Sequence, residues 1–180
     1  MRLACTVLVL AGVSAVSWAR AEEPKFSFPL IQGYGGVVTL PQATEQPRNG
    51  AKVVFDITAE SKPDEVNRGL ESVARYLNLN AQAGNAASDA KLALVLHGGA
   101  TKCALSDEAF RRHTKAEINP NLPLLRELKK HGVEVLVCGQ SLARNKYLTS
   151  DVASELTVAA SAMTVNVNKQ LEGYAYLSIH

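Results

Sequence analysis

Three short, almost wholly apolar runs constrain the fold of this chain more than any other feature of its sequence. They cover residues 52–58, 91–97 and 133–138, and stretches with helical character separate them. A strand without a polar face is covered on both sides, as in the parallel sheets of α/β proteins. Parallel neighbours also need long crossover connections, which the helical stretches supply. The pattern therefore predicts a mostly parallel sheet between two layers of helices.

Capping signals and apolar periodicity predict the elements between and after these runs. Residues 61–64 are typical of a helix start. An apolar stripe at helical spacing follows them: Val66, Leu70, Val73 and Leu77. A second helix is predicted over 121–131, with Gly132 as its stop. The remaining predicted elements are helices over 104–113 and 140–147, a strand over 156–160, a helix marked by Met163, Val167 and Leu171, and a last strand over 174–179. The sequence thus predicts a three-layer α/β/α sandwich with a sheet of about five strands.

Residues 1–21 have the pattern of a secretory signal peptide, with a short basic start and small residues before an expected cleavage near Ala21. The apolar run over 3–18 is about 16 residues long, shorter than the roughly 18 that a spanning helix needs. We therefore expect a periplasmic or secreted protein without a stable membrane anchor. Pro, Gly and Asn residues punctuate 22–50, which predicts an N-terminal arm before an α/β domain over 51–180.

The charge of the expected mature chain is balanced. The full sequence has 19 Lys+Arg and 17 Asp+Glu, and two of the basic residues, Arg2 and Arg20, belong to the leader. This balance excludes a strongly basic nucleic-acid binder and a polybasic membrane-surface protein. Of the three cysteines, Cys5 also lies in the leader, so Cys103 and Cys138 remain. Two thiols do not form a disulfide framework in a chain of this size.

The candidate chemistry follows the second and third apolar runs, because sheets of this class bind ligands at the carboxyl ends of their strands. If these two strands pair, as consecutive parallel strands often do, both remaining cysteines and His97 share one edge of the sheet. The candidate catalytic residues are Cys138, Cys103 and His97, and the candidate binding residues are Gly98, Gly99, Lys102, Gly139, Gln140 and Ser141.

Cys138 ends a strand and precedes a predicted helix start, where unpaired N–H groups favour a thiolate. A thiolate is the form that attacks sulfur, whereas the same position is also typical of a small buried hydrophobe. Cys103 stands beside Lys102, which makes it a second thiolate candidate, or a disulfide partner of Cys138 if their Cα atoms come within about 7 Å. His97 is either a general base or a hydrogen-bonded structural residue. No His/Cys pair has the close spacing of metal ligands, so neither a metal nor another cofactor is expected.

Several short motifs stand in order over about residues 52–180. They are VVFDI at 53–57, VNRGL at 66–70, YLN at 76–78, LHGGA at 96–100, NL at 121–122, VCGQSL at 137–142 and GYAY at 173–176. Together they resemble the DsrE/DsrF-like family of sulfur-relay proteins, specifically its exported branch. The resemblance implies a flavodoxin-like fold, homo-oligomers (trimers or hexamers), and a cysteine that carries a persulfide and passes sulfur to a partner protein. It implies Cys138 as that cysteine, surrounded by Gly139, Gln140 and Ser141, with Cys103 as the alternative.

We therefore expect a periplasmic persulfide carrier with sulfurtransferase-like chemistry, in which His97 and Lys102 steady the anion on Cys138. Its expected partners are further copies of itself and a sulfur donor or acceptor protein, and no nucleic acid. One alternative is a non-enzymatic oligomeric module that binds a small ligand or a partner and has structural cysteines. The other is a dithiol/disulfide redox protein that uses Cys103 together with Cys138.

Overall fold

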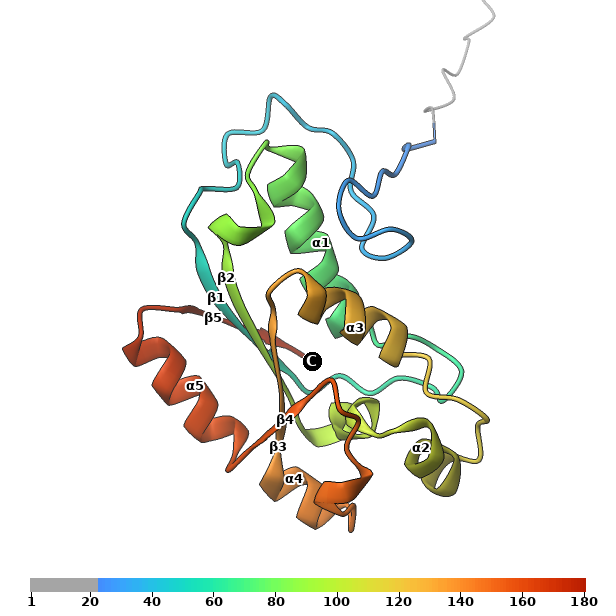
Figure 1. Ribbon diagram of the computed structural model, residues 1–180. Helices are drawn as coiled ribbons and strands as arrows, with labels where there is room; N and C mark the ends of the chain where they lie inside the picture. The colour runs from blue at the N-terminus through green and yellow to red at the C-terminus, as the bar shows by residue number, and fades with distance from the viewer. Residues whose placement is uncertain (1–22) are drawn as a thin grey trace, which may run out of the picture.

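The computed structural model describes residues 23–180, which fold around a five-stranded sheet (Figure 1). The strands are β1 (Lys52–Ile57), β2 (Lys91–Leu96), β3 (Glu134–Cys138), β4 (Thr157–Ala159) and β5 (Ala175–Ile179). The helices are α1 (Arg68–Gln82), α2 (Asp107–Thr114), α3 (Leu122–Lys130), α4 (Gly139–Arg144) and α5 (Ala162–Leu171), with short 3-10 helices η1 (Ala87–Asp89), η2 (Gly98–Ala104) and η3 (Thr149–Asp151). None of the helices within this range is long and apolar enough to cross a membrane. The predicted signal peptide over 1–21 lies outside the described residues.

All strand pairs are parallel, and the strands lie in the order β4-β3-β2-β1-β5. The chain adds β2, β3 and β4 in one direction and then returns to place β5 on the other side of β1. Because such crossovers are right-handed, the return connection puts its helix on the opposite face of the sheet. Helices α1 and α3 accordingly cover one face, and α5 is the only helix of residues 23–180 that covers the other (Figure 1). The predicted three-layer α/β fold is confirmed.

Alternation along each strand divides the core at the sheet into two clusters, and a third, small cluster of Leu105, Ala109 and Phe110 lies at α2. The larger cluster joins α1 and α3 to one face of the sheet, and includes Phe55 of β1 and Leu94 of β2. The smaller cluster lies under α5 and consists of Val54, Ala93, Val95, Leu136, Cys138, Ala162 and Val165. The α5 face therefore has a small apolar core, and polar side chains occupy this face at the strand ends.

The first helix begins later than the sequence predicts. Residues 61–64, which are typical of a helix start, are not helical, and α1 begins at Arg68 after the capping residue Asn67. The Oδ1 atom of Asn67 accepts a hydrogen bond from the Gly69 N–H at 2.8 Å, and its Nδ2 donates to the Ala59 carbonyl at 2.7 Å. A fully buried asparagine with these partners fixes the helix start more firmly than the local signal upstream.

The segment 23–50 lies against α1, and the buried side chain of Asn78 makes several of the hydrogen bonds that hold it there (Figure 1). Asn78 of α1 accepts hydrogen bonds from the Leu30 and Ile31 N–H groups at 2.9 and 2.8 Å. Its Nδ2 donates to carbonyls of the same segment, including that of Gly35 at 3.0 Å. The side chain of Ile31 is fully buried in the larger core cluster, so this arm forms part of the packed structure.

Candidate functional site

Three neighbouring strands bring polar, reactive side chains to the α5 face at their carboxyl ends. Asp56 lies one residue before the end of β1, His97 directly follows β2, and Cys138 ends β3. The β2–β3 ladder pairs Leu96 with Val137, so the next residues along the two strands, His97 and Cys138, are neighbours. The backbones of paired strands run about 5 Å apart, which places the imidazole and the thiol at one point of the sheet edge.

These side chains line an open cavity of about 730 Å³ at the carboxyl ends of the strands. Helix α4 contributes Gln140, Ser141 and Arg144, the first turn of α5 forms the opposite wall, and Tyr176 enters from β5. Four of the residues predicted for the site therefore meet here: Cys138, His97, Gln140 and Ser141. Within residues 23–180 no group of three or more His, Cys, Asp or Glu side chains is placed to hold a metal ion.

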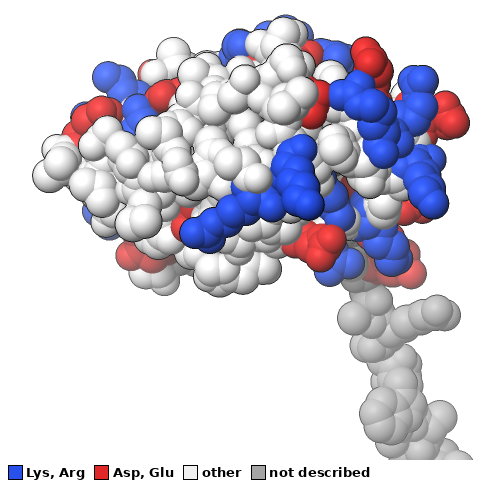
Figure 2. All heavy atoms as spheres, turned by 90° about the horizontal axis from the view of Figure 1, so that it is seen from below, with Lys and Arg blue, Asp and Glu red and all other residues white. Residues whose placement is uncertain are grey.

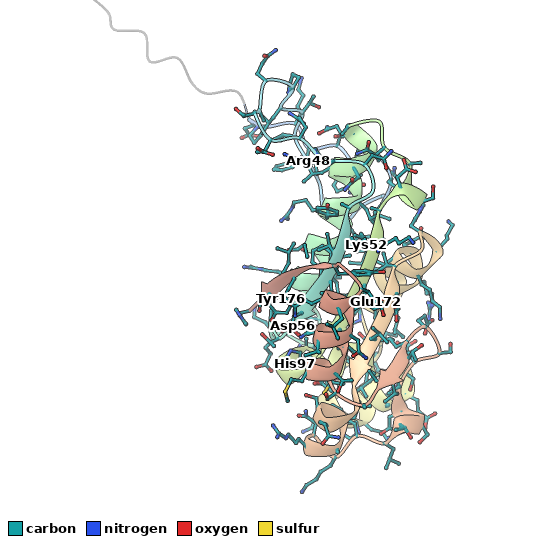
Figure 3. The ribbon with its side chains drawn as sticks, turned by 90° about the vertical axis from the view of Figure 1, so that its left-hand side faces the viewer. Arg48, Lys52, Asp56, His97, Glu172 and Tyr176 are labelled. Carbon is teal, nitrogen blue, oxygen red and sulfur yellow. The ribbon has the colours of Figure 1, made fainter. Side chains whose placement is uncertain are left out.

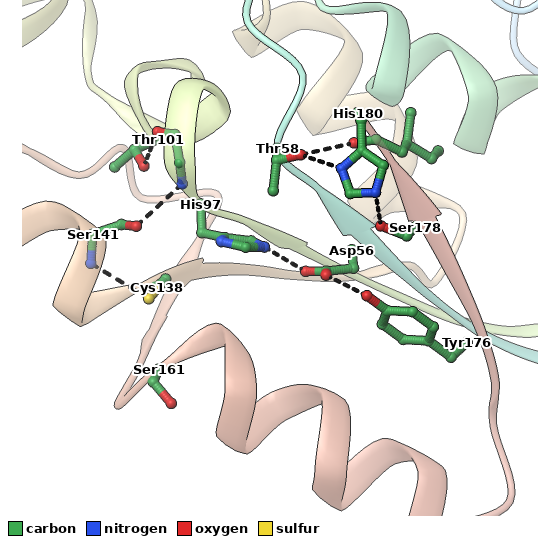
Figure 4. A network of polar contacts seen from close by, with 12 residues as sticks. Asp56, Thr58, His97, Thr101, Cys138, Ser141, Ser161, Tyr176, Ser178 and His180 are labelled. Carbon is green, nitrogen blue, oxygen red and sulfur yellow. Dashed lines mark hydrogen bonds and ion pairs between the residues drawn. The ribbon is translucent and has the colours of Figure 1, made fainter.

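The Cys138 sulfur is fixed by the start of α4. The Ser141 N–H donates to this sulfur at 3.4 Å, and the Ser141 Oγ accepts from the Gly98 N–H at 3.1 Å (Figure 4). A Cβ atom on Gly139 would lie 2.9 Å from the Ala159 carbonyl oxygen, so only glycine lets α4 begin this close to β4. One serine thus connects the thiol to the loop after β2, and one glycine allows the arrangement sterically.

A buried carboxylate connects His97 to β5. Asp56 is 6% exposed, its Oδ1 lies 2.6 Å from His97 Nε2, and its Oδ2 accepts a 2.6 Å hydrogen bond from the Tyr176 hydroxyl. This hydrogen bond raises the pKa of Tyr176, so the phenol keeps its proton. Figure 3, which looks onto the α5 face, shows the three residues following one another along the sheet. A histidine between a carboxylate and a thiol is an arrangement suited to general base catalysis.

The structure does not bring Cys103 and Lys102 to this cavity. Cys103 is fully buried in the cluster on the α1 and α3 face, and burial raises the pKa of its thiol to about 11. Lys102 lies 2.9 Å from Glu60, and this hydrogen bond lowers the pKa of the glutamate. Cys103 and Cys138 are free thiols that belong to separate core clusters on opposite faces of the sheet.

Gly98 and Gly99 lie beside the cavity and shape the loop after β2. Gly98 has a φ of +54°, which favours glycine, and a Cβ on Gly99 would lie 2.9 Å from the Glu60 Cβ atom. The role of these two glycines is therefore steric, because they let the chain turn sharply beside β1.

Among the titratable or charged residues that line the cavity, sequence reasoning missed three: Asp56, Tyr176 and Arg144. Asp56 could have been predicted from the sequence, because a single carboxylate inside an otherwise apolar strand needs a hydrogen-bond partner to compensate for its burial. Tyr176 stands 120 residues from Asp56, and no spacing rule connects them. Arg144 lies one helical turn beyond Gln140 on α4, so its position follows once the helix is known.

Comparisons with known proteins bear on the family and the fold. The sequence pattern of the DsrE/DsrF-like family matches residues 52–179. Among solved structures, the chain is similar to a protein of unknown function from Methanobacterium thermoautotrophicum, with a TM-score of 0.53 and 21% sequence identity. This match covers 72% of the present chain and 99% of the other, and at that identity it shows a shared fold. No curated protein matches the chain.

Proposed function

The chain belongs to the DsrE/DsrF-like family, which is related to sulfur relay, and from this premise we propose that it carries sulfur as a persulfide on Cys138. The observation that carries the proposal is the position of this thiol at the wall of an open cavity, next to His97 on the neighbouring strand. Cys138 is itself buried, at 5% exposure, but it lines this cavity, whereas Cys103 is fully buried on the other face of the sheet and lines no part of it. The proposed activity is that of a sulfurtransferase-like carrier.

The proposed transfer is an exchange at sulfur. The Cys138 thiolate attacks the outer sulfur of a donor persulfide, R–S–SH, and forms a new S–S bond while the donor S–S bond breaks. The products are the persulfide of Cys138 and the thiolate R–S⁻, so the step needs no oxidant. A partner thiol then takes the sulfur by the same exchange. Because Lys102 pairs with Glu60 outside the cavity, the cation assigned to the persulfide anion is Arg144.

Mass spectrometry after incubation with inorganic polysulfide tests this proposal. Peptide mapping should find an addition of about 32 Da, one sulfur atom, on Cys138. The Cys103→Ala protein should keep this adduct, and the Cys138→Ala protein should lose it. A folded wild-type protein that takes up no sulfur on Cys138, although its thiol is free by titration, would contradict the proposal.

We also propose that the protein forms homo-oligomers through α5. Met163, Val167 and Leu171 form an outward stripe on this helix and are 77%, 52% and 82% exposed, whereas Ala162 and Val165 pack on the sheet. Figure 2 shows an uncharged area on the left-hand side of the molecule, the side on which α5 lies in Figure 1, with charged side chains at its upper and lower margins. A second copy packed on this uncharged stripe meets no like-charge repulsion there, and most soluble oligomers are closed, symmetric homo-oligomers. The expected assembly is a trimer or hexamer.

The periplasmic location is likewise proposed. It depends on the pattern of residues 1–21, which precede the described part of the chain. N-terminal sequencing of protein recovered from the periplasm should give a mature chain that begins near Glu22, and an intact Met1 would contradict export.

A further inference from the structure

The buried carboxylate of Asp56 is not explained by the fold alone. Its strand is otherwise apolar on this face, and an apolar side chain at that position would satisfy the sheet equally well. Removing a carboxylate from water is unfavourable by several kcal/mol unless partners compensate for it. Here both oxygens are used, one by His97 and one by Tyr176. One partner directly follows β2 and the other lies near the start of β5, so the group connects β1 to both neighbouring strands on the α5 face.

The carboxylate determines which nitrogen of His97 carries the proton. An ionised Asp56 only accepts hydrogen bonds, so the Nε2 atom at 2.6 Å must be the donor. In a neutral imidazole the other nitrogen, Nδ1, is then unprotonated and accepts a proton. The Tyr176 hydroxyl donates to the second oxygen and keeps the carboxylate in this orientation. The side chain of His97 is 26% exposed, so its ring reaches the cavity while its Nε2 is held.

His97 and Cys138 face the same cavity from neighbouring strands (Figure 4). A general base acts through direct contact or through one bridging water, and an open cavity of about 730 Å³ has room for either. The other titratable or charged groups that face His97 are Asp56 from β1, Tyr176 from β5 and Arg144 from α4. Helix α5 contributes only uncharged side chains to the wall.

We propose that Asp56 and Tyr176 are positioning residues that hold His97 with Nδ1 free to take the proton of the Cys138 thiol. This inference rests on the proposed sulfur transfer and adds the proton path to it. The proton moves from Cys138 Sγ to His97 Nδ1, and the thiolate then attacks the outer sulfur of the donor R–S–SH. The leaving R–S⁻ takes the proton back from the imidazolium. The sum is Cys–SH and R–S–SH giving Cys–S–SH and R–SH, in which atoms and electrons balance.

The pH dependence of Cys138 alkylation by iodoacetamide tests the proton path without any sulfur donor. In the Asp56→Asn protein the amide also donates hydrogen bonds, so the preference for the reactive tautomer is lost. We expect alkylation at pH 7 to become about 10- to 100-fold slower. The Tyr176→Phe protein should be about threefold to tenfold slower. As the pH rises the rates should converge, because hydroxide then replaces the imidazole as the base.

Several controls separate positioning from stability. Tyr176 is 42% exposed, so Tyr176→Phe should fold even if Asp56→Asn does not. Tyr174→Phe is the matched control at a tyrosine outside this cavity, and its profile should equal that of the wild type. His97→Gln should give the same pH profile as Asp56→Asn. The variant that carries both changes should be alkylated no more slowly than either single variant, since Asp56 acts only through His97.

The result that overturns the proposal is an unchanged pH profile in folded Tyr176→Phe and Asp56→Asn proteins. If that profile is unchanged while Cys138 still takes up sulfur from polysulfide, the proton path fails and the carrier function stands. If the profile shifts as expected but no sulfur is taken up, the carrier function fails and the positioning of His97 stands.

Discussion

Cys103 and Cys138 have the same side chain and different surroundings. Cys103 is surrounded by core residues on the α1 and α3 face, and its sulfur lies 3.9 Å from the Ser61 hydroxyl. Cys138 is also buried, at 5% exposure, but it receives an N–H from Ser141 and lines the cavity. Reactivity follows the thiolate and its access to solvent, so the two thiols should behave differently in the folded protein.

The thiol of Cys103 should make stability depend on pH in the alkaline range. Its pKa is raised by burial from 9.0 to about 11, so the folded state holds this proton more tightly than the unfolded state. The resulting stabilisation is complete below about pH 9 and is lost as the pH rises through about 11, a change of about 3 kcal/mol. Urea unfolding at pH 8 and at pH 11 measures it.

The Cys103→Ala protein is the control for that measurement. At pH 8 it should be less stable than the wild type by about 1–2 kcal/mol, because a small cavity replaces the sulfur. At pH 11 this difference in the free energy of unfolding should vanish or change sign, since only the wild type loses the stabilisation that comes from the protonated thiol. A gap that stays constant from pH 8 to pH 11 would show that Cys103 titrates equally in both states.

At the scale of helices and strands, the elements with dense apolar patterns were predicted well. β1, β2 and β3 lie where continuous apolar runs predict them, because a strand buried on both faces leaves no polar alternation. The predicted start of α1 at residues 61–64 was wrong. The helix begins after Asn67, whose position is fixed by tertiary hydrogen bonds that the local sequence does not reveal. Periodicity also located α5, but it does not tell whether Met163, Val167 and Leu171 face the protein's own core or the outside.

The attachment of the N-terminal arm should depend on Asn78. Replacing it by leucine keeps the volume but leaves the Leu30 and Ile31 N–H groups and the Gly35 carbonyl without their partner. We expect the free energy of unfolding to fall by about 3 kcal/mol, and the Leu30 and Ile31 amides to lose protection in hydrogen exchange.

Gln82→Leu is the matched change on the same helix. Its side chain bonds Thr39 of the arm at an exposed position, so the expected loss is below about 0.5 kcal/mol. Equal losses in the two variants would mean that Asn78 has no special part in holding the arm.

At the scale of the whole molecule, the two layers of helices are unequal. The return connection to β5 leaves α5 as the only helix that covers its face within residues 23–180. Pairing of β2 with β3 was predicted, and with it the meeting of His97 and Cys138. The contribution of Tyr176 was not, because it depends on β5 pairing with β1 from the far end of the chain. Site residues on consecutive strands are thus accessible to sequence reasoning, and those on the returning strand are not.

The uncovered stripe on α5 should control assembly. A Leu171→Lys change places a charge in an apolar contact, so the mass in solution should fall toward that of a single chain. Light scattering coupled to size-exclusion chromatography measures this mass. Leu40→Lys is the matched control, because Leu40 is also exposed, at 63%, and lies in the arm away from α5. A wild-type protein of single-chain mass would contradict assembly through α5.

The position of Tyr176 on the last strand also has a consequence for the order in which the protein acquires its chemistry. Its contact with Asp56 spans 120 residues, and pairings of such long sequence separation form slowly. A chain still emerging from the ribosome, or still refolding, contains Cys138 before Tyr176 has reached Asp56. On the proposed proton path, the thiol would therefore reach its full nucleophilicity only when the two ends of the domain have met.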